Sequence, residues 1–252
     1  MIYDLQKASV LKRISAWMFD AIILATLAAG IAFIFSAVFG YDAKLDRMEE
    51  IYTEYEAEFG IDLEISDENF AKLTDEEKAK YDEANKKFGK DEEVIYLTNM
   101  LFTISLLIVS LSILIAFVIL ELILPLILKN GQTLGKKIFG IAVMRDDGVR
   151  ITPFVLFVRT VLGKYTIETM VPIFLIYLAF TGAGLAGALA LLLLLGFQIG
   201  LLIKTKTNSA IHDILAYTVT VDYASQMIFD SKEALMEYKN RVHAEDAEKK
   251  PY

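Results

Sequence analysis

The sequence predicts an all-α membrane protein with four transmembrane helices, a small cytoplasmic β element and a helical extracytoplasmic hairpin. The chain is 55% hydrophobic with a mean hydropathy of +0.46, and its apolar residues gather in long blocks almost free of charge. Its charges are also divided unevenly. Residues 41–93 contain 19 acidic and 8 basic residues, whereas the remainder has a small net positive charge. These two observations indicate a chain that occupies two aqueous compartments on either side of a bilayer.

The first apolar block, Ile14–Gly40, is long enough for a membrane span, which needs about 20 residues. It contains one charge, Asp20. The second block, Leu101–Leu128, also contains one charge, Glu121. Isolated charges at this depth are costly, so we expect each acid to have a partner elsewhere in the chain.

The third block, Thr169–Ile203, has 35 residues and no charge. As a single helix it would be about 52 Å long, whereas the hydrocarbon core is only about 30 Å thick. We therefore expect two spans, with a break near residues 181–184, where two glycines lower the helix propensity.

Basic residues flank these spans on one side. They are Lys7, Lys12, Arg13, Lys129, Lys136, Lys137, Arg145, Arg150, Arg159, Lys164, Lys204 and Lys206. Because basic residues favour the cytoplasmic side, both termini are expected to be cytoplasmic and residues 41–93 to lie outside. The expected location is the plasma membrane of a bacterial cell, with four crossings.

The segments between the spans carry their own patterns. Residues 43–59 place apolar side chains at helical spacing, and Thr74 with Glu77 has the spacing of a capping box, so we expect a helical hairpin broken around Gly60. Asp147-Gly148, between β-branched residues, predicts a β-hairpin in 140–152, with which residues 216–223 could pair. After Pro153, an amphipathic helix is expected to lie at the inner surface.

Three blocks of the sequence resemble the signature blocks of the RDD family of membrane proteins. They read "LKRISAWMFDAIIL", "GQTLGKKIFGIAVMRDDGVRITPF" and "AIHDILAYTVTV", in that order up to about residue 222. The acidic loop interrupts them like an insertion. The resemblance implies that the family's arginine is Arg13 and that its two aspartates are Asp20 and Asp213. It further implies a basic position at Arg159 and a structural motif at Gly131, Thr133, Gly135, Lys136 and Gly140.

The charged residues of these blocks predict a network near the cytoplasmic face that joins Arg13, Asp20 and Asp213, completed by Glu121 or Arg159. Asp20 and Glu121 lie at matched depth and could share a proton, because like charges close together raise one pKa. Alternatively, Arg159 neutralises one of them. The network could handle an ion or a proton, as membrane acids commonly do, or it could clamp the helices together through bidentate arginine bonds.

The expected function is that of a transport-associated component, coupled to ions or protons, because the resemblance implies association with transport or with regulation of partner proteins. The alternative is a non-catalytic scaffold or regulator of a partner membrane protein. Without cysteine and with two histidines, the chain is expected to be no enzyme and to hold no metal or cofactor. Expected partners are the lipid bilayer and either a second copy of the chain or another membrane protein, and not nucleic acid. "GFQIG" at 196–200 allows close helix contact, either within the chain or in a dimer.

The sequence thus divides into six segments. These are 1–40 (N-terminus and first span), 41–93 (acidic insertion), 94–128 (second span), 129–165 (β-hairpin and amphipathic helix), 166–203 (third and fourth spans) and 204–252 (strand and C-terminal tail).

Overall fold

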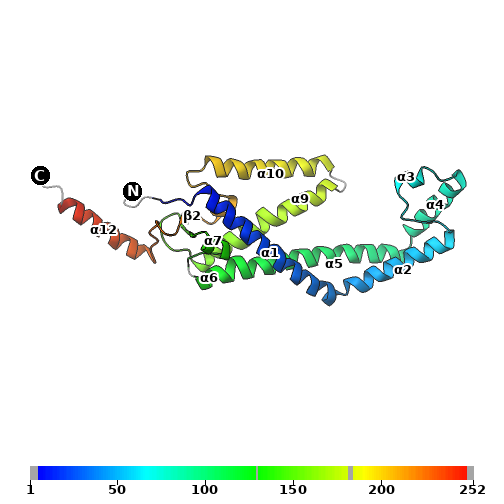
Figure 1. The fold of residues 1–252 in the computed structure, drawn as a ribbon, viewed down its shortest axis with the longest axis horizontal. Coiled ribbons are helices and arrows are strands. Elements are labelled where there is room, and N and C mark those ends of the chain that lie inside the picture. Colours follow the sequence, from blue (N-terminus) through cyan, green and yellow to red (C-terminus); the bar gives the residue numbers. More distant parts are fainter. Residues whose placement is uncertain (1–4, 129, 181–183, 249–252) are drawn as a thin grey trace. The chain divides into compact units, whose positions relative to one another are not determined.

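The structure is a computed structural model that describes residues 5–128, 130–180 and 184–248 (Figure 1). It divides into two compact units. The first unit contains the chain up to Ala28 and from Ile113 onward, and the second unit contains Ala29–Ser112. Helix α1 (Val10–Phe39) and helix α5 (Glu92–Phe117) contribute residues to both units.

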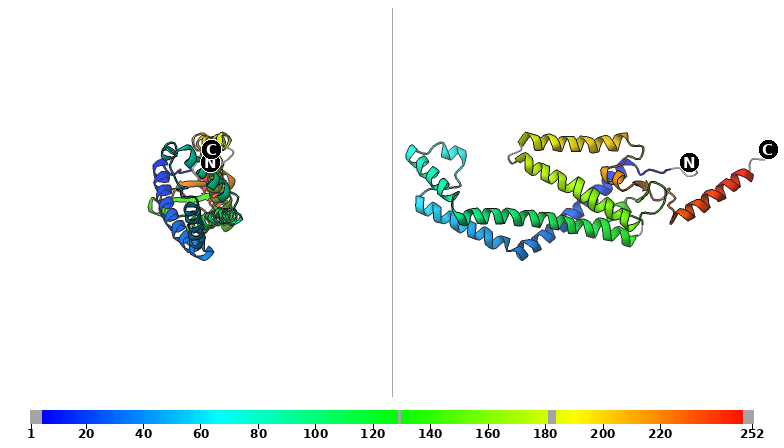
Figure 2. Two further views of the ribbon diagram at one scale, coloured as in Figure 1. Left: turned by 90° about the vertical axis from the view of Figure 1, so that its right-hand side faces the viewer. Right: turned by 180° about the vertical axis from the view of Figure 1, so that it is seen from behind.

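Four helical stretches are long and apolar enough to cross a membrane, as the sequence predicts. They are Val10–Phe39, Glu92–Leu128, Pro153–Phe180 and Gly184–Lys204. The third apolar block is divided between α9 (Val171–Phe180) and α10 (Gly184–Lys204), which lie side by side (Figures 1 and 2). Residues 181–183 of the expected break lie outside the described residues, as does Lys129. The chain is therefore an all-α membrane protein with a small sheet.

Two of the long helices contain π-helical turns, in which hydrogen bonds run between residues five apart. The second long helix is made of α5, η1 (Val118–Ile123) and α6 (Leu124–Leu128), and the third of α8 (Pro153–Phe157), η2 (Val158–Met170) and α9. In η2, the hydroxyl of Thr169 donates to the carbonyl of Lys164 at 2.9 Å, which satisfies a backbone group. Such turns are rare and recur at functional sites.

The helix expected at the inner surface after Pro153 is not a separate element. The structure continues from Pro153 to Phe180 as one helix, because η2 joins the amphipathic stretch to the apolar one. Charged residues that the sequence places at the interface, Arg159 and Lys164, therefore lie on a long apolar helix.

The second unit contains a helical hairpin, as expected. Helix α2 (Tyr41–Phe59) ends at Gly60, a short α3 (Asp67–Phe70) follows, and α4 (Asp75–Phe88) begins with the predicted Thr74–Glu77 capping box. The hairpin and the start of α5 enclose an apolar core of Met48, Ile51, Tyr55, Leu63, Ala84, Val94 and Leu97. Burial of these side chains holds the hairpin together.

The two strands of the first unit pair with each other, as the sequence suggested. Strand β1 (Ile141–Arg145) is antiparallel to β2 (Thr218–Asp222), with Val143 opposite Thr220. The hairpin expected around Asp147-Gly148 differs: its returning arm forms a single bridge to β1, between Met144 and Arg150. Beyond this bridge the arm pairs with another segment instead of β1, because the Arg150 N–H donates to the carbonyl of Phe229.

Two short helices and one longer helix complete the first unit. Helix α7 (Leu134–Ile138) precedes β1, α11 (Ile211–Leu215) precedes β2, and α12 (Lys232–Glu248) follows the sheet. Helix α7 begins beside Asp20 and α11 begins beside Glu168, two half-buried acids, so these two helices position the site described below.

Candidate functional site

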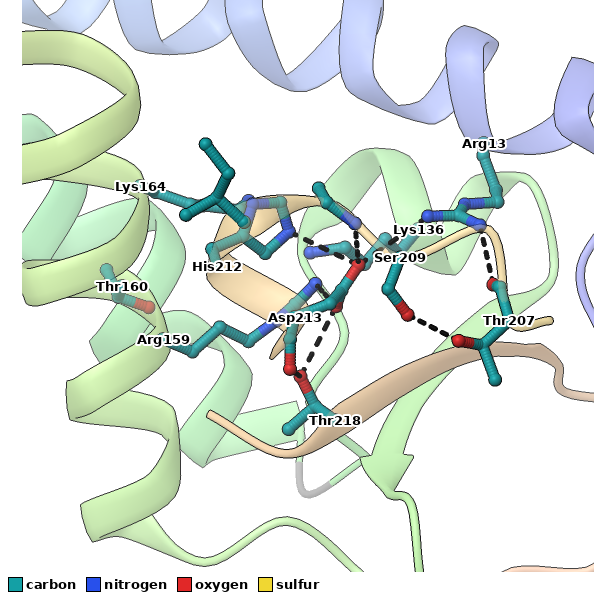
Figure 3. A network of polar contacts seen from close by, with 12 residues as sticks. Arg13, Lys136, Arg159, Thr160, Lys164, Thr207, Ser209, His212, Asp213 and Thr218 are labelled. Atoms are coloured by element: carbon teal, nitrogen blue, oxygen red, sulfur yellow. Dashed lines mark hydrogen bonds and ion pairs between the residues drawn. The ribbon is translucent and has the colours of Figure 1, made fainter. Parts of the chain in front are cut away.

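The centre of the site is Asp213, on α11, whose side chain is 1% exposed (Figure 3). A guanidinium nitrogen of Arg159 lies 2.7 Å from Oδ1, and a nitrogen of Arg13 lies 3.6 Å from Oδ2. The hydroxyl of Thr218 donates to Oδ1 at 3.3 Å. The structure thus brings Arg13, Arg159 and Asp213 together from α1, η2 and α11.

The electrostatics keep Asp213 ionised. Burial by itself raises the pKa of this carboxyl, but the nearby positive charges, that of Arg159 above all, outweigh burial and hold the pKa at about 2. Arg13 is held more loosely, since its second contact is a 3.3 Å hydrogen bond to the carbonyl of Thr207. Asp213 therefore joins one tightly and one loosely bound arginine.

A second buried cluster surrounds Glu121, in η1. Lys164 Nζ lies 2.5 Å from Oε1, and Lys136 Nζ lies 3.5 Å from Oε2. The hydroxyl of Thr160, in η2, donates to the Glu121 backbone carbonyl at 2.9 Å, which links the two π-helical segments. Burial lowers the pKa of Lys136 to about 8, although Glu121 acts in the opposite sense. Glu121 is thus paired with two lysines.

Asp20 does not join either cluster through an ion pair in the described part of the chain. Its carboxylate accepts one hydrogen bond from the hydroxyl of Thr133. It accepts a second hydrogen bond, 2.8 Å long, from the backbone N–H of Gly135. These donors lie at the start of α7, whose first turn leaves N–H groups free. The expected network of Arg13, Asp20 and Asp213 is corrected accordingly: Asp20 binds neutral donors. The expected sharing of a proton between Asp20 and Glu121 has no contact to support it.

The contact between α1 and α7 depends on a glycine. A Cβ atom at Gly135 would lie 2.4 Å from the backbone oxygen of Ala16 and 3.0 Å from the carboxylate of Asp20. Only a residue without a side chain lets α7 approach Asp20 this closely. Elsewhere in the same motif, Gly131 and Gly140 have φ of 61° and 64°, values that favour glycine.

Sequence reasoning missed a third pair, Glu168 and His212. The Nδ1 atom of His212 lies 2.6 Å from Glu168 Oε2, and the His212 backbone N–H donates to Oε1 at 3.0 Å. Gln198, on α10, donates to the same Oε1 at 3.1 Å. Glu168 directly precedes the uncharged third block. This position, immediately next to a charge-free run, was the signal in the sequence that could have identified Glu168 as a site residue.

His212 also faces the central aspartate. Its Nε2 atom lies 3.7 Å from Asp213 Oδ2, the same oxygen that Arg13 approaches. Burial lowers the pKa of His212, and the charge of Arg159 lowers it further, while Asp213 opposes this shift. Close packing explains the burial, because a Cβ atom at Gly163 would lie 2.5 Å from the Cβ of His212.

All three groups border one cavity of 890 Å³ in the first unit. Its charged lining side chains are Arg13, Asp20, Glu121, Lys136, Arg159, Lys164 and Glu168, with His212 beside them. The remaining lining is mostly apolar and comes largely from α1 and α10. The arrangement provides a polar wall inside a chamber of the size that small molecules occupy.

The two glycines of the "GFQIG" stretch, Gly196 and Gly200, have open space where a side chain would lie within the described structure. A Cβ atom at Gly196 or Gly200 would meet nothing within 4 Å, so the alternative of internal packing at these glycines is not seen. Gln198, between them, instead contacts Glu168 and the N–H of Ile211.

The four apolar helices and the charged cavity between them define a polytopic membrane protein with buried Arg–Asp ion pairs. Comparison with protein families matches the chain to the RDD family over residues 7–217. The chain belongs to the RDD family, as its signature blocks suggested. Neither the comparison with curated proteins nor that with solved structures gave a match.

Proposed function

We propose that this RDD-family protein is a transport-associated membrane component in which a proton controls access of a solute or ion to the 890 Å³ cavity. The observation that carries the proposal is the contact of His212 with both Glu168 and Asp213 at the cavity wall. Histidine is the side chain whose charge changes most readily near neutral pH. The charges serve binding and proton movement in this proposal, and no covalent catalysis.

The coupling step follows from a competition for one oxygen. When His212 is neutral, a proton on Nδ1 suits the 2.6 Å contact with Glu168, and Nε2 offers no hydrogen to Asp213. Protonation adds an Nε2–H and a positive charge 3.7 Å from Asp213 Oδ2. Arg13 approaches the same oxygen at 3.6 Å and is bound loosely. Protonation of His212 thus weakens the hold of Asp213 on Arg13, which lines the cavity on α1.

The orientation in the membrane is part of the proposal. The basic flanks support cytoplasmic termini and an external acidic hairpin in a plasma membrane. Single cysteines at the exposed positions Ala57 and Ala244 of this cysteine-free chain should react from opposite sides of intact cells, with Ala57 reacting from outside. Reaction of both from one side would contradict this orientation.

The second candidate is a static scaffold or regulator of a partner membrane protein, and a specific observation favours it. The carboxylates of Glu121, Glu168 and Asp213 each already have a basic or imidazole partner within 2.7 Å. Such pairs suit a clamp that fixes the helices. If the network is such a clamp, the protein carries no proton flux. Loss of the His212 charge would then leave the decay of a proton gradient unchanged.

The experiment compares the two histidines of the chain. Purified protein in liposomes with an internal pH dye is exposed to opposing gradients of protons and of Na⁺ or K⁺, and the decay of the proton gradient is measured. His212→Gln should abolish protein-dependent decay, whereas His243→Gln, on an exposed part of α12, should not. Unchanged decay in His212→Gln, or no protein-dependent decay in the unsubstituted protein with any of these cations, would contradict the proposal and favour the scaffold.

A further inference from the structure

Among its described residues, the polar wall of the cavity contains a buried hydrogen-bond donor without a partner and a second that is held only by a long ion pair. Arg159 is 3% exposed and lines the cavity, and its Nε–H has no hydrogen-bond partner among the described residues. Lys136 is 8% exposed, and its ammonium is held by a 3.5 Å ion pair with Glu121, longer than the 2.5 Å pair that Lys164 makes. Leaving a donor such as the Arg159 Nε–H buried without an acceptor costs free energy.

The acceptors of the same wall are occupied. Asp20 accepts from Thr133 and Gly135, and Glu168 accepts from His212 and Gln198. The lining therefore offers donors to a ligand more readily than acceptors. Its four bases, Arg13, Lys136, Arg159 and Lys164, also outnumber its three acids. Both features favour a ligand group that accepts hydrogen bonds and carries negative charge.

The rest of the cavity is apolar. Helix α1 contributes Trp17, Ala21 and Leu24, and helix α10 contributes residues such as Leu194 and Leu202. A small inorganic anion would leave this surface in contact with water, whereas a hydrocarbon chain would cover it. The volume of 890 Å³ is of the size that holds one small-molecule ligand.

We propose that the cavity binds an anionic amphiphile from the bilayer, with a phosphate or carboxylate head group at Arg159 and Lys136 and a single hydrocarbon tail between α1 and α10. The inference rests on the proposed function in using the same cavity, and it names the class of substrate. Binding is measured without flux, so the two proposals can fail separately.

The test uses Trp17, the single tryptophan of the chain, which lines the cavity. Full-length protein in a neutral detergent is titrated with an amphiphile whose brominated tail quenches tryptophan and whose head is glycerol phosphate. The same brominated tail with an uncharged alcohol head, and with a phosphocholine head, measures partition into the micelle. We expect saturable quenching by the anionic probe at least tenfold tighter than by the other two. Equal quenching by all three would overturn the proposal.

Two neighbouring lysines supply a matched pair of variants. Lys136→Gln removes the buried donor and should weaken binding of the anionic probe about tenfold, which is about 1.4 kcal/mol. Lys137→Gln removes an exposed charge one residue away and should bind like the unsubstituted protein. Equal weakening by both variants would mean a general surface attraction and would overturn the proposal. If Lys136→Gln does not fold, the comparison of head groups on the unsubstituted protein decides.

A competition experiment distinguishes an anionic amphiphile from a free inorganic anion as the ligand. Inorganic phosphate added at millimolar concentration should not displace the brominated probe, because it lacks the tail. Displacement by phosphate alone would mean that the site holds a free anion. That result would overturn the proposal that the ligand is an amphiphile. Preferential binding of the anionic probe by a protein that shows no proton flux would leave this inference intact while removing the proposed function.

Discussion

Among the described residues, the ion pairs of the second unit are all exposed, whereas the first unit contains buried pairs beside exposed ones such as Arg150–Asp230. In the second unit, Arg47 pairs with Glu93 at 2.8 Å and with Glu50 at 3.0 Å, and all three side chains are at least 39% exposed. In the first unit, Arg159 and Asp213 pair at 2.7 Å with exposures of 3% and 1%. The distances are nearly the same, but the surroundings are not.

This difference determines what each pair contributes. Water screens an exposed pair, and ordering two long side chains offsets most of its attraction. The second unit is therefore held by its apolar core around Ile51 and Tyr55. A buried pair gains little over an apolar core of the same shape, but removal of one partner leaves a charge without compensation. The first unit thus cannot lose one member of its network without destabilisation.

The largest expected effect is that of Asp213→Ala. It leaves Arg159 buried without its carboxylate, and should lower the free energy of unfolding by about 3–5 kcal/mol. The measurement is equilibrium unfolding in mixed micelles. Asp213→Asn, which keeps the shape and one acceptor, should lose less. A loss below about 1 kcal/mol for Asp213→Ala would show that the first unit does not depend on this pair.

A smaller effect is expected for Gly135→Ala. The added Cβ would lie 2.4 Å from the backbone oxygen of Ala16, so α7 must move away from α1, at a cost of about 1–3 kcal/mol in unfolding free energy. Gly196→Ala is the control, because its Cβ meets nothing within 4 Å and alanine favours the helix. Equal stability of the two variants would contradict the close approach that positions Asp20.

The smallest effect is expected for Arg47→Ala. Its carboxylate partners are exposed to solvent, so the melting temperature of the protein should not change measurably. Ile51→Ala, which removes a buried side chain of the same helix, should cost about 2–5 kcal/mol and shows that the assay detects the second unit. A clear loss of stability in Arg47→Ala would contradict the expected difference between exposed and buried ion pairs.

Much of the fold follows from local patterns. Charge-free blocks predicted the four long helices, the Thr74–Glu77 spacing predicted a capping box that the structure contains, and alternation in 216–223 predicted a strand that pairs with β1. Each of these signals lies within a short window of sequence. The π-helical turns have no such signal, because they accommodate packing between helices distant in sequence.

The site was less predictable than the fold because its partners are of different chemical kinds. A search for opposite charges leads from Asp213 to Arg13 and Arg159, and the structure contains both ion pairs. The same search fails for Asp20, whose partners are a hydroxyl and a backbone N–H. The search for opposite charges also fails for Glu168, because its partner is His212 and histidine is counted as neutral when charges are read from a sequence.

The partners of Asp20 have a consequence for biosynthesis. Thr133 lies 113 residues beyond Asp20. At a translation rate of about 5–20 residues per second, the ribosome needs roughly 6–23 s to make the donors after the acid has been made. During that interval the first helix carries a carboxylate that has none of its final hydrogen bonds. The nascent chain must keep this carboxylate in contact with water or with an insertion factor until α7 emerges.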